Sequence, residues 1–183
     1  MDLSGNKGLL DGYLVAFFAS RTAPPEALDL ATQWAREIAQ TDKIVISGFH
    51  SPIERAVLEI LLAHNRPVVV ALGRSLYRRI PQYFSQAYLQ NQVLFIAVRD
   101  MSRQSGFSAQ VRNWSVADMA RETVFAPYEP TSQLSSLRHY LLSGAKKVAI
   151  LGLSAPFLSP PTPCPLPSTI SAGPLLAAWA PCF

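Results

Sequence analysis

Hydroxyl and arginine side chains follow the first apolar run of the sequence, and this combination can hold a phosphate. The run from Tyr13 to Ala19 leads into Ser20, Arg21 and Thr22, shortly before a helical segment. Backbone N–H groups at a helix start, a hydroxyl and a fixed positive charge are groups that bind phosphate. The structural alternative is that Ser20 or Thr22 caps the helix while Arg21 lies in solvent.

The second apolar run ends in a helix start with a clear capping pattern. Ser51 and Glu54 have the spacing of a capping box, and Pro52 falls on the first helical position, where its missing N–H costs nothing. A carboxylate at this place would lie close to any bound phosphate. We therefore expect Glu54 to cap the helix or to accept a ribose hydroxyl.

The capping pattern leaves Ser47, Gly48 and His50 without a structural explanation. A glycine in a tight turn lets the backbone approach a ligand closely, and a histidine can donate to a phosphate or a base. The alternative is a surface histidine that packs on its own turn. With Ser51, these residues are candidates for a phosphate or nucleic-acid site.

Arginines gather after the third and fourth apolar runs. Gly73 and Arg74 end the third run, Arg78 and Arg79 follow, and Tyr77 and Tyr83 lie among them. After the fourth run come Arg99, Arg103, Gly106, Phe107 and the pair Arg112-Asn113. From Arg66 to Arg112 there are seven arginines and one acid, Asp100, so this stretch alone carries +6. Such a stretch favours an anionic partner, either a phosphate or a strand whose bases stack on aromatic rings, over solvated arginines without a ligand.

Alternating strands and helices must position these residues. Six apolar runs predict strands: Tyr13 to Ala19, Ile44 to Ser47, Val68 to Leu72, Val93 to Val98, Thr123 to Ala126 and Val148 to Leu151. Five segments between them predict helices: Pro25 to Gln40, Pro52 to His64, Pro81 to Gln90, Ala109 to Arg121 and Ser132 to Leu142. This pattern is typical of a Rossmann-like three-layer α/β/α fold with a mostly parallel sheet of about six strands. Ligands bind such sheets outside the carboxyl ends of the strands.

Composition excludes several classes of protein. The chain of 183 residues is long enough for one domain, and its two cysteines, Cys164 and Cys182, form no zinc pattern and no disulfide scaffold. No GxGxxG or GxxxxGK[ST] pattern occurs. No leader-like or membrane-spanning run is present, which predicts a cytoplasmic protein with no membrane partner. We expect no cofactor, no metal and no catalytic residues.

The chain divides into three segments by composition. Residues 1–12 are expected as an N-terminal arm, and residues 13–153 as the Rossmann domain. Residues 154–183 hold eight of the fifteen prolines and no charge. This tail is an ordered apolar extension, a Pro-rich linker cut short or an out-of-frame tail; the abrupt loss of charge favours a non-native or truncated end.

In their order along the chain, these motifs resemble the Smf/DprA family of DNA-processing proteins. The resemblance covers Tyr13 to Leu153 and rests on these segments: Ala19-Ser20-Arg21, Ser47-Gly48, Ala71-Leu72-Gly73-Arg74-Ser75-Leu76 with Pro81, and Phe107 followed by Arg112-Asn113. It implies an extended Rossmann fold that binds single-stranded DNA in a basic pocket. It further implies a possible homodimer, a RecA-type recombinase as partner and a role in DNA uptake during transformation.

The sequence departs from the family pattern at several of these positions. Ala19 stands where the family has glycine, His50 where it has a small residue, Pro52 where it has glycine and Glu54 where it has aspartate. The serine-rich stretch before the last helix is echoed only by Thr131-Ser132. These differences indicate a divergent relative.

Three functions compete. A DNA-binding protein ranks first and a nucleotide-binding or nucleotide-sensing module of the same superfamily ranks second. A nucleotide phosphoribohydrolase ranks third, because the Pro-Gly-Gly-x-Gly-Thr-x-x-Glu motif of those enzymes is absent and the chain has no Gly-Gly pair.

Overall fold

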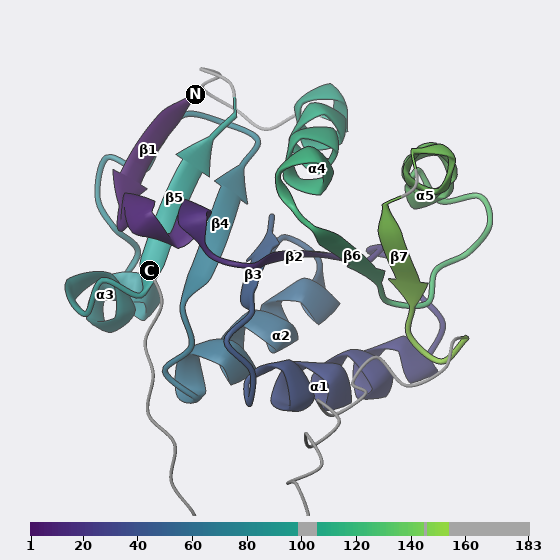
Figure 1. Ribbon diagram of the computed structural model, residues 1–183, viewed down its shortest axis with the longest axis horizontal. Helices are drawn as coiled ribbons and strands as arrows, with labels where there is room; N and C mark the ends of the chain where they lie inside the picture. The colour runs from purple at the N-terminus through teal and green to yellow at the C-terminus, as the bar shows by residue number, and fades with distance from the viewer. Residues whose placement is uncertain (99–105, 145, 154–183) are drawn as a thin grey trace, which may run out of the picture.

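Every apolar run predicted as a strand forms one, in a single mostly parallel sheet (Figure 1). The structure, a computed structural model, describes residues 1–98, 106–144 and 146–153. Its strands are β1 (Asp2–Gly5), β2 (Leu14–Phe18), β3 (Ile44–Ser47), β4 (Val68–Leu72), β5 (Val93–Ala97), β6 (Glu122–Phe125) and β7 (Lys147–Ile150). Their order is β1-β5-β4-β3-β2-β6-β7, and only β1 runs antiparallel to its neighbour. The Rossmann-like α/β fold is confirmed, with seven described strands instead of about six.

Helices cover both faces of this sheet, as Figure 1 shows. On one face lie α1 (Glu26–Ile38), α2 (Pro52–Ala63) and α3 (Gln82–Leu89); on the other lie α4 (Gly106–Met119), α5 (Leu134–Ser143) and the short 3-10 helix η1 (Lys7–Asp11). The five predicted helices are therefore present, although α4 begins three residues before the expected Ala109. None of the described helices has the length and apolar character needed to cross a bilayer.

Two separate apolar clusters join the helices to the sheet. On one face Phe17 stacks on Trp34 of α1, with ring centroids 4.8 Å apart. On the other, Phe18 lies against Phe125 of β6 at 5.5 Å. Successive side chains of a strand point to opposite faces, so these adjacent phenylalanines hold opposite layers. A sheet buried on both faces explains why its strands are apolar throughout.

The N-terminal segment contributes an edge strand that the sequence pattern did not predict. β1 pairs with β5, and the hydroxyls of Ser4 and Tyr88 lie 3.0 Å apart. Gly5 has a φ of 109°, a conformation that favours glycine. Because β1 contains one large apolar residue, Leu3, hydrophobic periodicity could not identify it.

A buried carboxylate lies at the amino-terminal ends of the strands. Glu122, 2% exposed, accepts hydrogen bonds from Tyr13 Oη at 2.8 Å, Lys43 Nζ at 2.8 Å and Lys147 Nζ at 2.5 Å. Burial raises the pKa of Glu122, but these three hydrogen bonds outweigh it and hold the pKa below its ordinary value.

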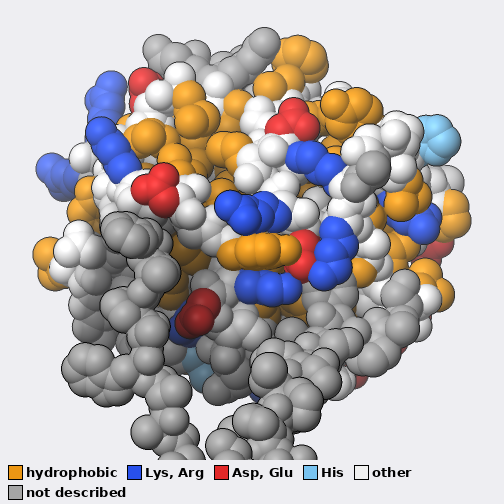
Figure 2. All heavy atoms as spheres, viewed as in Figure 1, with side chains coloured by type: hydrophobic (Ala, Val, Ile, Leu, Met, Phe, Trp, Pro, Cys, Tyr) orange, Lys and Arg blue, Asp and Glu red, His pale blue; other side chains and the backbone are white. Residues whose placement is uncertain are grey.

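The face drawn in Figure 2 carries basic and acidic side chains interleaved. Such mixed charge does not favour an anion site there.

Candidate functional site

A cleft lies beside β2, where the chain connections of the sheet switch from one face to the other. β2 lies between β3 and β6, and the helices that follow β2 and β6 cover opposite faces of the sheet. Doubly wound sheets bind ligands at the carboxyl ends of such strands. An open cleft of about 720 Å³ lies at this point, and we call it the edge cleft.

The edge cleft brings together most of the predicted site residues. It is lined by the turn after β2, the turn after β3, one side of α4 and the start of α5. The predicted residues in its lining are Ser20, Arg21, His50, Ser51, Glu54, Arg112 and Asn113. Neither Ser20 nor Thr22 caps α1, since the helix begins after Pro25 without a side-chain cap. Both side chains instead lie at the cleft, with their hydroxyl oxygens 3.4 Å apart.

Glu54 holds the two turns of the edge cleft together. One carboxylate oxygen accepts a hydrogen bond from Ala19 N at 3.2 Å; the other accepts from His50 N at 2.7 Å and Ser51 N at 3.2 Å. Ser51 Oγ in turn accepts from Glu54 N at 3.1 Å, which completes the predicted capping box. The side chain of Glu54 thus links β2 to the start of α2 and is 4% exposed.

These contacts confirm that Glu54 caps the second predicted helix. They also occupy backbone donors near the predicted phosphate site, because the Glu54 carboxylate accepts from the N–H groups of Ala19, His50 and Ser51. An internal anion therefore occupies the backbone donors. The cationic side chains in the lining of the edge cleft are Arg21 and Arg112.

Arg112 is a buried cation fixed in one orientation. Its Nε and Nη2 donate to Asn113 Oδ1 at 3.1 and 2.8 Å, and the residue is 5% exposed. The remaining nitrogen, Nη1, is buried and has no hydrogen-bond partner within the described residues. Burial lowers the pKa of the guanidinium, and the nearby Glu54 carboxylate partly opposes this. An anion that reached Nη1 would satisfy both its charge and its free donor.

Gly48 makes room for this guanidinium. A Cβ atom on Gly48 would lie 2.5 Å from Arg112 Cζ, which is closer than real atoms approach. The glycine is therefore explained by a side chain of the protein rather than by close approach of a ligand. The strained position of the turn is the next residue, Phe49, whose φ of 51° is unusual for a buried aromatic residue.

His50 lies at the border between the edge cleft and a second cleft between α2 and α3, because it lines both. Burial, followed by the charges of Arg112, Arg55, Arg74 and Arg21, lowers the pKa of His50 to about 4. Its Nε2 is buried without a hydrogen-bond partner in the described chain. The ring is therefore neutral at pH 7 in the free chain, and His50 is not the solvated surface histidine of the alternative interpretation.

We expect NMR titration of the His50 ring to give a midpoint near pH 4, and a higher midpoint in the presence of oligo-dT. A bound phosphate adds negative charge beside the ring and so favours its protonated form. Signals of the exposed His64 and His139 serve as internal references. A free-protein midpoint near 6.5, the ordinary value, would show that the surrounding arginines do not act on the ring.

The second cleft is lined by Arg74, the predicted cation that follows β4. We call it the helix cleft; its volume is about 730 Å³ and its lining includes Gly48, His50 and Arg74. Arg74 thus lines the helix cleft, whereas Arg21 lines the edge cleft.

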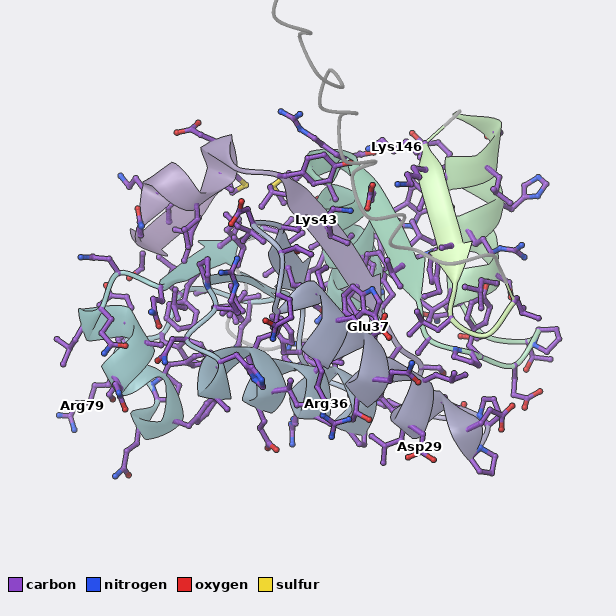
Figure 3. The ribbon with its side chains drawn as sticks, turned by 60° about the horizontal axis from the view of Figure 1, so that its bottom comes forward. Asp29, Arg36, Glu37, Lys43, Arg79 and Lys146 are labelled. Carbon is purple, nitrogen blue, oxygen red and sulfur yellow. The ribbon has the colours of Figure 1, made fainter. Side chains whose placement is uncertain are left out.

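The other predicted residues lie outside both clefts. Ser47 and Gly73 are buried and line neither cleft. Arg78 and Arg79 are exposed, and Figure 3 shows Arg79 at the outer side of the turn before α3. Arg99 and Arg103 lie outside the described residues. Of the described arginines in the basic stretch, Arg74 and Arg112 line one of the two clefts, whereas Arg66, Arg78 and Arg79 do not.

Sequence reasoning did not single out Arg55 and Gln133, and it named Ser132 only as part of the Thr131-Ser132 pair. Arg55, in the first turn of α2, lines the helix cleft, and the other two directly precede α5 and line the edge cleft. The signal for Arg55 was its place four residues after the Ser51 cap. In the described ranges, no three histidine, cysteine, aspartate or glutamate side chains gather as a metal site would require.

Comparison by sequence finds no relative: no family model matches the chain, and neither does any curated protein. Solved structures do match. DNA processing protein A from Helicobacter pylori, described for its single-stranded DNA binding mode, superimposes with a TM-score of 0.64 at 19% identity over 81% of this chain and 69% of that one. DNA processing protein A from Streptococcus pneumoniae gives 0.55 at 17% identity, covering 80% of this chain. The present chain spans 62% of that protein, less than two thirds of its length.

The Moco carrier protein of Chlamydomonas reinhardtii has the same architecture. It superimposes with a TM-score of 0.51 at 14% identity, over 77% of this chain and 76% of that one. The resemblance to the Smf/DprA family is thus confirmed at the level of the fold, within a group of structures whose members differ in what they bind.

Proposed function

We propose that the chain binds single-stranded DNA and places a backbone phosphate in the edge cleft beside Arg21 and Arg112. One observation carries the proposal: Arg112 is buried at the point where the sheet topology places ligands, and its Nη1 lacks a partner in the described chain. The acid nearest in the same cleft, Glu54, accepts three backbone hydrogen bonds and caps α2.

Two features favour a strand over a single nucleotide. Arg55 and Arg74 line the adjoining helix cleft, so cations extend beyond the space one phosphate needs. Tyr77 and Tyr83 line the same cleft and offer stacking surfaces for bases. The Helicobacter pylori protein described for single-stranded DNA binding shares the fold.

A nucleotide-binding module is the second candidate. The edge cleft, at about 720 Å³, falls within the range of small-molecule sites. The Moco carrier protein shows that this architecture also occurs in a protein named for carrying a small cofactor. Both candidates are binding functions, and we propose no reaction for the site.

Binding of an oligo-dT 20-mer should weaken steeply as salt rises, because each neutralised phosphate releases counterions from the strand. If Arg21 and Arg112 each neutralise one phosphate, log K should fall with log salt with a slope of about −1.4 or steeper. Fluorescence anisotropy of a labelled 20-mer across a salt series, with dTMP as competitor, measures this. A 20-mer that binds no better than dTMP would favour the nucleotide module instead.

Arg36 provides the matched control for charge. It lies on the outer side of α1, away from both clefts, and Figure 3 shows it with Asp29 and Glu37 along that helix. Arg36→Ala removes one positive charge, as Arg21→Ala does. We expect only Arg21→Ala to reduce the salt slope, by about 0.7.

Finer functions are extensions of this proposal. A homodimer, a RecA-type recombinase as partner and a role in transformation or recombination follow from the family resemblance. They describe whole DNA-processing proteins, and the present chain spans 62% of the Streptococcus pneumoniae protein. A role in transformation or recombination would act through the proposed binding of single-stranded DNA.

A further inference from the structure

The helix cleft combines an apolar floor with aromatic and cationic walls. Leu58 of α2 and Phe84 of α3 contribute to the floor, and Tyr77, Tyr83 and Arg74 to the walls. It adjoins the edge cleft at His50, which lines both. A strand bound in the edge cleft can therefore continue past His50 into this cleft.

The two tyrosines of the helix cleft are held in different ways. Tyr77 packs edge-on against the buried Phe95 with ring centroids 5.3 Å apart, and the Arg74 guanidinium lies 4.8 Å from the Tyr77 ring centroid. Tyr83 rests on Phe84 at 4.4 Å and is 64% exposed. Tyr77 is therefore fixed by the core, whereas Tyr83 presents an open ring to an incoming group.

The lining of the helix cleft favours an anionic ligand that also has a flat, apolar part: its arginines attract the anion, and its tyrosines offer flat surfaces. Arg55 and Arg74 outnumber the one acid in the lining, Glu59. The phenol of Tyr83 is neutral at pH 7 and does not repel a phosphate, since burial and the neighbouring Tyr77 raise its pKa further above the ordinary value of 10. A nucleobase with its flanking phosphates has both parts. An acidic peptide without aromatic residues lacks the flat surface, and a purely apolar peptide lacks the negative charge.

We propose that the helix cleft receives a nucleobase of the bound strand, stacked on Tyr83, with Arg74 and Arg55 beside its flanking phosphates. This inference rests on the proposed DNA binding and assigns it a second, base-binding subsite. Stacking needs a π face and no particular base, so the subsite gives affinity without strong sequence preference.

The test compares an oligo-dT 20-mer with a strand of equal length and equal phosphate number that carries abasic sugars. The wild-type chain should bind oligo-dT about tenfold more tightly than the abasic strand, since stacking on one aromatic ring has about this effect. Tyr83→Ala should remove this preference while leaving affinity for the abasic strand unchanged. Tyr83→Phe retains the ring and should retain the preference.

Tyr140→Ala is the matched control. Tyr140, 47% exposed, lies on α5 against Trp114 and lines neither cleft. Both side chains are exposed, so both alanine variants should fold. Thermal unfolding of the two variants checks this. The control should bind both strands as the wild type does.

The outcomes separate the two proposals. If the wild type binds both strands equally and with a steep salt dependence, the base subsite is wrong and phosphate binding stands. Retention of the preference in Tyr83→Ala also overturns the subsite. If neither strand binds, DNA binding and the subsite both fail.

Discussion

Replacing Arg112 with methionine is expected to weaken oligo-dT binding about 10- to 100-fold. A hydrogen bond to a charged group contributes about 1.5–3 kcal/mol, and 1.4 kcal/mol corresponds to a factor of ten. Two bonds to Asn113 already fix the Arg112 guanidinium, so binding a phosphate orders little further. Methionine retains the buried aliphatic part of the side chain but supplies no donor and no charge.

The Arg112 prediction has two controls that separate binding from folding. Arg138→Met removes another arginine whose Nε is buried without a partner in the described chain, but Arg138 lines a different cavity, between β7 and α5. It should leave DNA binding unchanged. Gly48→Ala keeps Arg112 but places a Cβ 2.5 Å from its Cζ, so the guanidinium must move.

Gly48→Ala should therefore weaken binding without any change in net charge. The added Cβ meets the end of a side chain and no backbone, so the guanidinium can shift at the expense of its bonds to Asn113 while the fold survives, which thermal unfolding checks. Binding in Arg112→Met equal to that of the wild type would show that the phosphate lies elsewhere. Wild-type affinity in Gly48→Ala would show that the orientation of the guanidinium does not matter.

The fold could be predicted from sequence because its signals are local and repeated. The runs Ile44–Ser47 and Val68–Leu72 match β3 and β4 to the residue, and the capping box at Ser51 and Glu54 identifies the start of α2. β1 lacked such a signal, since its stability comes from pairing with β5 rather than from its own side chains.

The site was predicted less well because it depends on contacts between distant segments. The sequence indicates that Gly48 and Arg112 follow strand ends, but only the fold shows that one makes room for the other. Likewise Arg66, counted with the basic stretch, lies at the opposite end of the sheet, where its guanidinium donates to Thr41 O.

Glu122 had a signal that went unused. It begins β6, Lys43 immediately precedes β3 and Lys147 begins β7, so a parallel sheet brings all three to one edge. Charged residues at the starts of neighbouring parallel strands are candidates for pairing even when far apart in sequence. Charge that is paired in this way contributes little to attraction of an anion.

Replacing Glu54 with alanine is expected to lower the free energy of unfolding by about 3 kcal/mol, because three buried or partly buried N–H groups lose their acceptor at about 1 kcal/mol each. Those donors belong to Ala19, His50 and Ser51 at the edge cleft. The change also opens a vacant anion site at the start of α2. Thermal and urea unfolding measure the loss.

The vacant site makes the Glu54 prediction distinctive, because a small carboxylate should restore part of the stability. Formate or acetate at ten times its Kd would contribute about 1.4 kcal/mol to Glu54→Ala. The wild type should show no such effect. Glu122→Ala is the matched control, since it also removes a buried glutamate, but one whose partners are side chains that can turn to solvent.

The same variant tests how the edge cleft balances stability against binding. Glu54 places a negative charge near Arg112, so its removal makes the cleft more positive and frees backbone donors for phosphate. Folded Glu54→Ala should therefore bind oligo-dT at least as tightly as the wild type, despite its lower stability. Weaker binding, together with no rescue by formate, would mean that Glu54 shapes the cleft only by holding its turns in place. Tighter binding with rescue would show that the protein fills its own phosphate site with a carboxylate and leaves ligand binding to the arginines.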